Sequence, residues 1–295
     1  MWSWTRHPAV VRFARNRAAV AGAVVLAGFV SVAATGPALA PHSPTEQDLG
    51  NNYAPPSLRH PLGTDDLGRD TFSRLIHGAR ISLGVSASSV AIGLLAGTAL
   101  GLLAGYHRGW VDRALMRVTD VMLAFPGILL AVVVVAILGK GLGNTIVAVA
   151  LMAAPTFARI ARGSALTVGE MDFVLASRAL GASDARIVLR HLLPDCLSPL
   201  LVQATLMLGT AILIASGLSF LGLGVQPPDP EWGAMLSKGR ELIRTAPVSA
   251  VAPGVALTLL VLSVSLVGDG LRDALDPRLR PARPITRGVR PERSQ

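Results

Sequence analysis

Residues Ile81–Gly105 read ISLGVSASSVAIGLLAGTALGLLAG, a run without a single charged side chain. A helix needs about 20 predominantly apolar residues to cross the hydrocarbon core of a bilayer, so this stretch predicts a membrane-spanning helix. Its many glycine and serine residues let a second helix approach closely, as helix interfaces inside membranes require. We therefore expect Ile81–Gly105 to pack against other spans rather than to face lipid.

The composition of the whole chain agrees with a membrane protein. Hydrophobic residues make up 51% of the 295 residues and charged residues 15%, whereas soluble domains carry about 25% charged residues. Five further apolar stretches are long enough to span: Ala18–Gly36, Val121–Gly139, Asn144–Ala161, Leu197–Gly224 and Val248–Gly268. The sequence thus predicts an all-α integral membrane protein with six transmembrane helices, and Pro126 and Pro253 predict bends in the third and sixth.

The first span has a second interpretation, because basic residues precede it and Ala38-Leu39-Ala40 follows it. That order is typical of a cleaved signal peptide, but an apolar run of about 7–15 residues is usual there and this one is longer. We expect a retained span, preceded by a cytoplasmic N-terminus over residues 1–17.

The distribution of charge predicts the orientation. With the N-terminus inside, 19 of the 27 Lys and Arg residues fall in internal segments, whereas acidic residues divide almost evenly between the two sides. Positively charged loops remain in the cytoplasm, so both termini are expected there. The net charge of +9 then needs no nucleic-acid partner, and the Arg- and Pro-rich tail, residues 277–295, is expected to be disordered and to contact anionic lipid.

Residues 37–80 form the first external segment. Thr64 or Asp65 is placed to cap a short amphipathic helix with Leu67, Phe72, Leu75 and Ile76 on one face. The acidic residues there lack the spacing of an EF-hand, so no metal site is predicted. His42, His60 and His77 nevertheless lie in this segment. A metal ion as the transported substrate therefore remains an alternative.

A second external segment, Val225–Pro247, contains a short amphipathic stretch that begins at Trp232. A tryptophan at this depth is commonly an interfacial anchor. The alternative is that Trp232 and Gly233 contact an external partner protein.

The internal segment from residue 162 to 195 is too polar to span and too regular to be a linker. It predicts a helix that stops at Gly181, a natural left-handed terminator, followed by a helix capped by Ser183. Pro194 is expected to end that second helix just before the fifth span. The result is a helix–turn–helix on the cytoplasmic side.

Catalytic motifs are absent from the sequence. There is no G-x-x-x-x-G-K-[ST], no H-E-x-x-H, no G-x-S-x-G and no cysteine cluster, since Cys196 is the single cysteine. The predicted span interiors also lack ionisable residues, which ion-driven carriers usually need. We therefore predict no catalytic residue and no bound cofactor, with energy supplied by a partner on the cytoplasmic helix–turn–helix.

Five motifs in order carry a family resemblance: HPLGTDDLGRDTFSRLIHGARISLGV from His60, DVMLAFPGILLA from Asp120, ASRALGASDARIVLRHLLP from Ala176, PPDPEWGAMLSKGR from Pro227 and GDGLRDALDPRLR from Gly268. Together they resemble binding-protein-dependent ABC importer permeases of the peptide/nickel branch, and in particular the dipeptide and oligopeptide "C" permeases. The resemblance covers about residues 59–280.

The resemblance implies a type I importer fold in which residues 81–276 form a five-helix core and the first span is an addition. It implies a homologous second permease, two cytoplasmic ATPases that use ATP and magnesium, and an external substrate-binding protein, in a bacterial cytoplasmic membrane. The family's coupling helix corresponds to Gly181–Leu193. The implied ATPase-coupling residues are Ala176, Gly181, Ala182, Ser183, Asp184, Arg186, Ile187, Arg190 and His191. One position departs from the family, because its usual glutamate is Leu175 here.

The function that follows is a permease subunit, not an enzyme, in an ATP-driven importer of dipeptides or oligopeptides. Import of nickel, glutathione or another small solute by the same machinery remains an alternative. A membrane scaffold without transport is an alternative of a different class.

Overall fold

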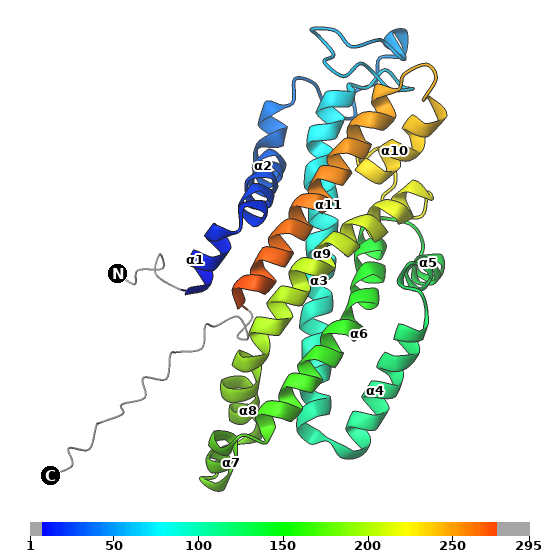
Figure 1. Cartoon of the computed structure of the whole chain (residues 1–295). Helices are drawn as coiled ribbons and strands as arrows, with labels where there is room; N and C mark the ends of the chain where they lie inside the picture. The colour runs from blue at the N-terminus through cyan, green and yellow to red at the C-terminus, as the bar shows by residue number, and fades with distance from the viewer. Residues whose placement is uncertain (1–7, 276–295) are drawn as a thin grey trace, which may run out of the picture.

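Long helices make up most of residues 8–275, the part of the chain that the computed structural model describes (Figure 1). The predicted tail and the first seven residues lie outside this range. The helices are α1 (Pro8–Arg15), α2 (Arg17–Leu39), α3 (Thr71–His107), α4 (Gly109–Ala124), α5 (Gly127–Leu138), α6 (Leu142–Gly169), α7 (Asp172–Ala179), α8 (Asp184–Ile187), α9 (Leu193–Phe220), α10 (Trp232–Glu241) and α11 (Val248–Leu275).

Five helical segments in the described residues are long and apolar enough to cross a membrane: α2, α3, α6, the segment from α8 to α9, and α11. A sixth span is formed if α4 and α5 are taken as one, bent by 99°. The bend lies at Pro126, as predicted, since proline cannot donate the hydrogen bond that would continue α4. Pro253 lies in the second turn of α11 and does not interrupt it. The all-α membrane fold is thus confirmed.

Helices α3 and α6 approach each other closely, and glycine makes this contact possible. Gly93, Gly97, Gly101 and Gly105 recur at every fourth residue of α3 and face α6. A Cβ atom added to Gly93 would lie 2.9 Å from the carbonyl oxygen of Ala150, and one on Gly97 would overlap the carbonyl oxygen of Ala154. The backbones of α3 and α6 are therefore in direct contact. The prediction that this span packs against another helix is confirmed.

Helix α2 lies along the outside of the bundle, against α3 and α11 (Figure 1). Two of its glycines mark the contacts: a Cβ on Gly22 would lie 2.7 Å from Leu266, and one on Gly36 would lie 2.6 Å from Ile76. The short α7 and α8 lie at one end of the bundle, hereafter the α7 end. Helix α10 and residues 41–70 lie at the opposite end, hereafter the α10 end (Figure 1).

The predicted amphipathic helix does not begin at Thr64 or Asp65: Phe72, Leu75 and Ile76 lie in the first turns of α3, and residues 41–70 contain no α-helix. They form an irregular segment with one 3₁₀ turn, Leu49–Asn51, and α3 begins at Thr71, where Asp70 accepts a hydrogen bond from the Ser73 amide at 2.7 Å. The Asp65 carboxylate instead accepts from the amides of Leu67 and Arg69. Such local side-chain bonds compete with helix formation, which explains the difference.

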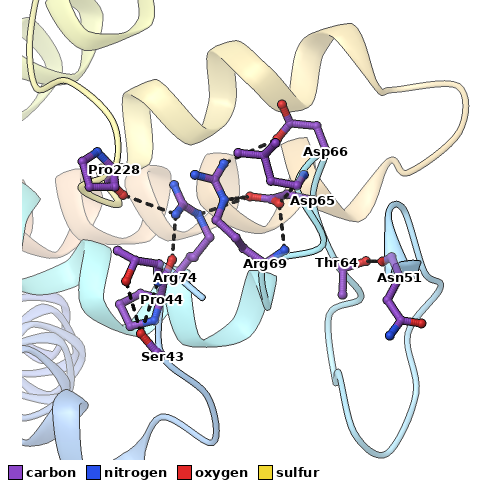
Figure 2. Close-up of polar contacts among 11 residues, drawn as sticks. Ser43, Pro44, Asn51, Thr64, Asp65, Asp66, Arg69, Arg74 and Pro228 are labelled. Atoms are coloured by element: carbon purple, nitrogen blue, oxygen red, sulfur yellow. Dashed lines mark hydrogen bonds and ion pairs between the residues drawn. The ribbon is translucent and has the colours of Figure 1, made fainter. Parts of the chain in front are cut away.

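Buried arginines hold this segment against the bundle (Figure 2). The Arg69 guanidinium donates to Asp65 at 2.7 Å, and Arg74 of α3 donates to the carbonyl of Pro44 at 2.8 Å. Thr64, 1% exposed, donates to the carbonyl of Asn51 and accepts from a backbone amide. The α10 end therefore carries an ordered cover over the start of α3.

Candidate functional site

The helix–turn–helix of the α7 end turns at Gly181. This residue has φ +80°, a value that L side chains rarely adopt, and its amide donates to the carbonyl of Arg178 at 3.0 Å. The amide of Ala182 donates to Ser177 at 3.1 Å and closes the end of α7. A Cβ on Gly181 would meet no atom within 4 Å, so only the backbone angle requires glycine here.

Pro194 does not end the second helix, contrary to the sequence prediction. Helix α8 continues through a π-helical turn, Val188–Leu192, directly into α9, so the residues from Asp184 to Phe220 form one helical segment. Pro194 directly follows this π turn, whose wider ring accommodates the proline within the continuous segment. A force applied to α8 thus acts directly on a spanning helix.

Six of the nine predicted coupling residues have exposed side chains or backbone: Ala176, Gly181, Ser183, Asp184, Arg186 and Arg190. Ala182 and His191 are half-buried, and His191 Nε2 lies 3.3 Å from the Ser177 hydroxyl of α7. Ile187 is 0% exposed and belongs to the hydrophobic core. Its side chain therefore anchors α8, and its part in ATPase coupling stays a prediction. Ser183 occupies the N-cap position without a side-chain hydrogen bond.

Three contacts join this segment to α3 and the α3–α4 turn. The Tyr106 hydroxyl donates to Asp184 at 2.5 Å, and the Arg178 guanidinium lies 5.6 Å from the centre of the Tyr106 ring. The Arg108 guanidinium donates to Glu170. The partners are 62 to 78 residues apart in the chain, so no local pattern in the sequence indicated them.

Helix α4 is joined to α6 by two ion pairs near the same end. Arg162 binds Asp112 through two hydrogen bonds of 2.5 and 2.7 Å, and Arg159 binds Asp120 at 2.7 Å. Both arginines are thus held by carboxylates of the neighbouring helix. The α7 end of the bundle is thus connected from α4 through α6 to the turn at Gly181.

Apolar side chains are exposed on the same surface. Leu180, just before the glycine turn, is 89% exposed, and Phe173 and Leu175 of α7 are nearly half exposed. Leu175, at the position of the family's usual glutamate, therefore lies on the surface. Leu180 was not among the predicted contact residues, although its place beside a turn glycine is a usable signal. Exposed apolar groups beside exposed arginines characterise a protein-binding surface.

Trp232 is packed inside the α10 end rather than presented on it. Its side chain is 1% exposed, its indole nitrogen donates to the carbonyl of Leu75 at 2.9 Å, and Phe29 of α2 meets its ring edge-on at 5.7 Å. A Cβ on Gly233 would overlap the backbone of Ser216. Trp232 and Gly233 thus pack inside the bundle, and their contact with an external partner stays a prediction.

Beside it, the carboxylate of Glu231, in a residue 2% exposed, joins three helices. It accepts hydrogen bonds from Ser82 of α3 at 3.2 Å, from Ser216 of α9 at 3.0 Å, and from the Ala234 amide of α10 at 2.9 Å. All three partners donate, and between them they bind both carboxylate oxygens. Helix α10 is thereby fixed to the bundle.

A hollow of about 560 Å³ lies between α3 and α9 and extends to Tyr106 and Val188 at the α7 end. Leucines supply most of its lining, among them Leu94, Leu102 and Leu197. A peptide's charged termini and amide groups need polar partners when they leave water, and this lining supplies almost none. The hollow is suited to apolar chains rather than to a peptide.

The geometry defines a multi-pass membrane protein with a helix–turn–helix at one end that exposes apolar and basic side chains. A family model described as "Binding-protein-dependent transport system inner membrane component" matches residues 97–281, and a second, "N-terminal TM domain of oligopeptide transport permease C", matches residues 7–56. The chain belongs to this family of ABC importer permeases.

Similar proteins and a similar solved structure support this family membership. A dipeptide transport system permease of Alkalihalophilus pseudofirmus is 46% identical, with 90% of this chain and 88% of that protein covered. A glutathione transport system permease of Pectobacterium atrosepticum is 47% identical, with 91% and 90% covered. A chain of the MetNI methionine ABC transporter, solved in inward-facing conformations, superposes with a TM-score of 0.56 at 25% identity, with 69% of this chain and 96% of that chain covered.

These matches confirm the type I importer permease fold, the peptide/nickel branch and the role as a permease of a bacterial ABC importer. The chain is the inner-membrane component and not the ATPase, and permeases of this family bind no cofactor, since ATP is used by the partner ATPases. It works within a binding-protein-dependent complex with ATPase partners. A scaffold without transport is excluded by this membership.

Proposed function

We propose that this chain is one of two homologous permease subunits of an importer for dipeptides and related short peptides. The observation that carries the proposal is its identity of 46–48% to two dipeptide or di/tripeptide permeases along nine-tenths of its length. Glutathione, itself a short peptide, is the second candidate, because permeases named for glutathione transport are 47–49% identical. Nickel remains a third substrate to be tested.

The proposed complex contains this chain, a homologous partner permease, two cytoplasmic ATPases and an external substrate-binding protein. The α7 end is then cytoplasmic and the α10 end external, with both termini in the cytoplasm. The excess of Lys and Arg in the segments on the α7 side supports this orientation.

We infer that the exposed residues around Gly181 bind one ATPase. Leu180 offers an apolar contact there, and Arg186 and Arg190 offer positive charge, while the buried Ile187 keeps α8 in place. Movement of the ATPase would pull α8, and with it the continuous helix through α9. The Tyr106–Asp184 bond would carry the same movement to α3, so that the spans tilt between inward-open and outward-open states.

A transport assay tests the substrate. The four partner subunits and this chain are reconstituted in vesicles, and uptake of labelled dipeptide, glutathione and Ni²⁺ is measured with ATP. Uptake of dipeptide in competition with excess tripeptide, but not with Ni²⁺, is expected. Uptake of Ni²⁺ alone would overturn the peptide proposal and leave the permease role intact.

A charge reversal tests the ATPase contact. The double variant Arg186→Glu, Arg190→Glu is expected to assemble with the partner permease and to lose ATPase co-purification. The matched control is Arg113→Glu on α4, an exposed arginine on the same side of the predicted topology. Equal ATPase recovery with the double variant and the control would contradict the assignment.

A further inference from the structure

Two histidines and one aspartate converge at the α10 end, at the start of α3. Their potential ligand atoms, one each from His42, His60 and Asp70, all lie within 4.8 Å of one another. His60 Nδ1 is 3.0 Å from Asp70 Oδ1, and His42 Nδ1 is 3.9 Å from Asp70 Oδ2. The two imidazole rings are stacked with their centres 4.8 Å apart, so both present a nitrogen to the same carboxylate.

The polar atoms of this cluster are incompletely satisfied. His42 Nδ1 is buried and has no hydrogen-bond partner, and a buried polar atom without a partner is costly. The Asp70 side chain is 1% exposed, and its ion pairs within residues 8–275 are with these two histidines alone.

Hydrogen bonds that involve the backbone hold all three residues in place without an ion. The His42 amide donates to the Ser73 hydroxyl of α3 at 3.1 Å, and the His60 amide donates to the Ser57 hydroxyl at 3.1 Å. Asp70 Oδ2 is held by the Ser73 amide at 2.7 Å, which leaves Oδ1 directed at His60. One carboxylate oxygen thus caps the helix while the other is available to a ligand.

We propose that His42, His60 and Asp70 form a binding site for a late first-row divalent cation, with Zn²⁺ as the ion that the donors fit best. Two imidazole nitrogens and one carboxylate oxygen are a common ligand set for zinc, and a fourth position stays open to water. Ligand atoms on a tetrahedral zinc lie about 3.3–3.5 Å apart, so a rotation of the His42 ring closes the set. With the ion bound, the proton of the neutral His60 ring is on Nε2, which leaves Nδ1 free to coordinate, and the ion places positive charge beside Asp70.

The site would act as a clamp on the external segment. The chain between His42 and His60 would be closed into a loop and fastened to the first turn of α3, which lies beside the Arg74 contact to Pro44. This clamp concerns a resident ion, so it does not depend on which substrate is transported.

Metal binding by the assembled complex tests the site. The complex is purified on a tag without histidines, treated with EDTA, and titrated with Zn²⁺ in competition with a chromogenic chelator. Variants His42→Phe and His60→Phe keep ring packing, and Asp70→Asn keeps an acceptor for the Ser73 amide. Loss of outer-shell partners alone weakens metal binding about 10–100-fold, so loss of a direct ligand is expected to weaken it at least about 100-fold.

His77→Phe is the matched control, because this histidine lies two turns into α3 and its Nδ1 is hydrogen-bonded to the Ser73 carbonyl. It should retain the zinc affinity of the unmodified complex. Co²⁺ provides a second readout: visible absorption bands of a low-coordinate site should appear in the unmodified complex and in His77→Phe, and be absent from the three ligand variants. Zinc affinity that is equal in the unmodified complex and all four variants would overturn the proposal and leave a hydrogen-bonded His–Asp cluster.

Discussion

Trp232 lies directly on Gly78 of α3: a Cβ atom added to this glycine would be 2.6 Å from the indole ring. The two residues are 154 positions apart, and the indole also donates to the carbonyl of Leu75 one turn earlier. An aromatic side chain thus fills a space that the absence of a side chain on α3 creates. This pair, with Glu231 beside it, fixes the orientation of α10.

Trp232→Ala is therefore expected to destabilise the fold by about 3–5 kcal/mol, the usual cost of removing a large buried side chain. Because the effect is on folding, basal and substrate-stimulated ATP hydrolysis of the complex should fall together. Trp110→Ala, at a tryptophan that is 73% exposed, is the control and should leave the unfolding temperature unchanged. A selective loss of stimulation with unchanged stability would restore the partner-contact interpretation.

The glycine row of α3 gives a second prediction. Gly97→Ala places a Cβ onto the carbonyl oxygen of Ala154, and overpacking of this kind costs about 1–3 kcal/mol. Gly84→Ala on the same helix meets nothing within 4 Å and should be neutral or slightly stabilising, because alanine favours helix. Thermal unfolding of both variants in one detergent checks this, and equal unfolding temperatures would contradict the close α3–α6 contact.

The sequence predicted these spans well because span length and small-residue content are local properties. Ile81–Gly105 was recognised as a packing helix from its glycines, and the break at Pro126 from its missing amide. The same local reasoning located the turn at Gly181, where one residue sets the backbone angle.

Burial at the two ends was not predicted correctly, because it depends on distant partners. The sequence predicts neither the burial of Trp232, which it favours as an interfacial anchor, nor that of Ile187, a predicted coupling residue, yet both are buried. Tyr106 and Asp184, which are hydrogen-bonded, are 78 residues apart, so no local sequence pattern predicts their contact. In residues 41–70, the side chain of Asp65 competes with helix formation, and helix-capping rules alone do not decide that competition.

Leu180 provides a prediction for the surface that sequence reasoning missed. Leu180→Asp should leave the unfolding temperature unchanged, since the side chain is 89% exposed. It should reduce co-purification of the ATPase, because a charge would have to be desolvated in the contact. Leu39→Asp, at an exposed leucine that ends α2, is the control for a change of charge away from this surface. ATPase recovery that is the same for both variants would remove Leu180 from the contact.

Gly181 allows the backbone of the coupling segment to be tested separately from its surface. At φ +80° a β-branched residue is strained by on the order of 1–2 kcal/mol, while no neighbouring atom obstructs a side chain. Gly181→Val should therefore change the angle between α7 and α8 and weaken ATPase binding, while assembly with the partner permease is retained. Gly181→Asn carries a side chain of similar size but tolerates positive φ, so it should restore most of the ATPase binding. If Gly181→Asn were as defective as Gly181→Val, side-chain bulk rather than backbone conformation would be the cause; if both retained full ATPase binding and transport, the turn at Gly181 would not contribute to coupling.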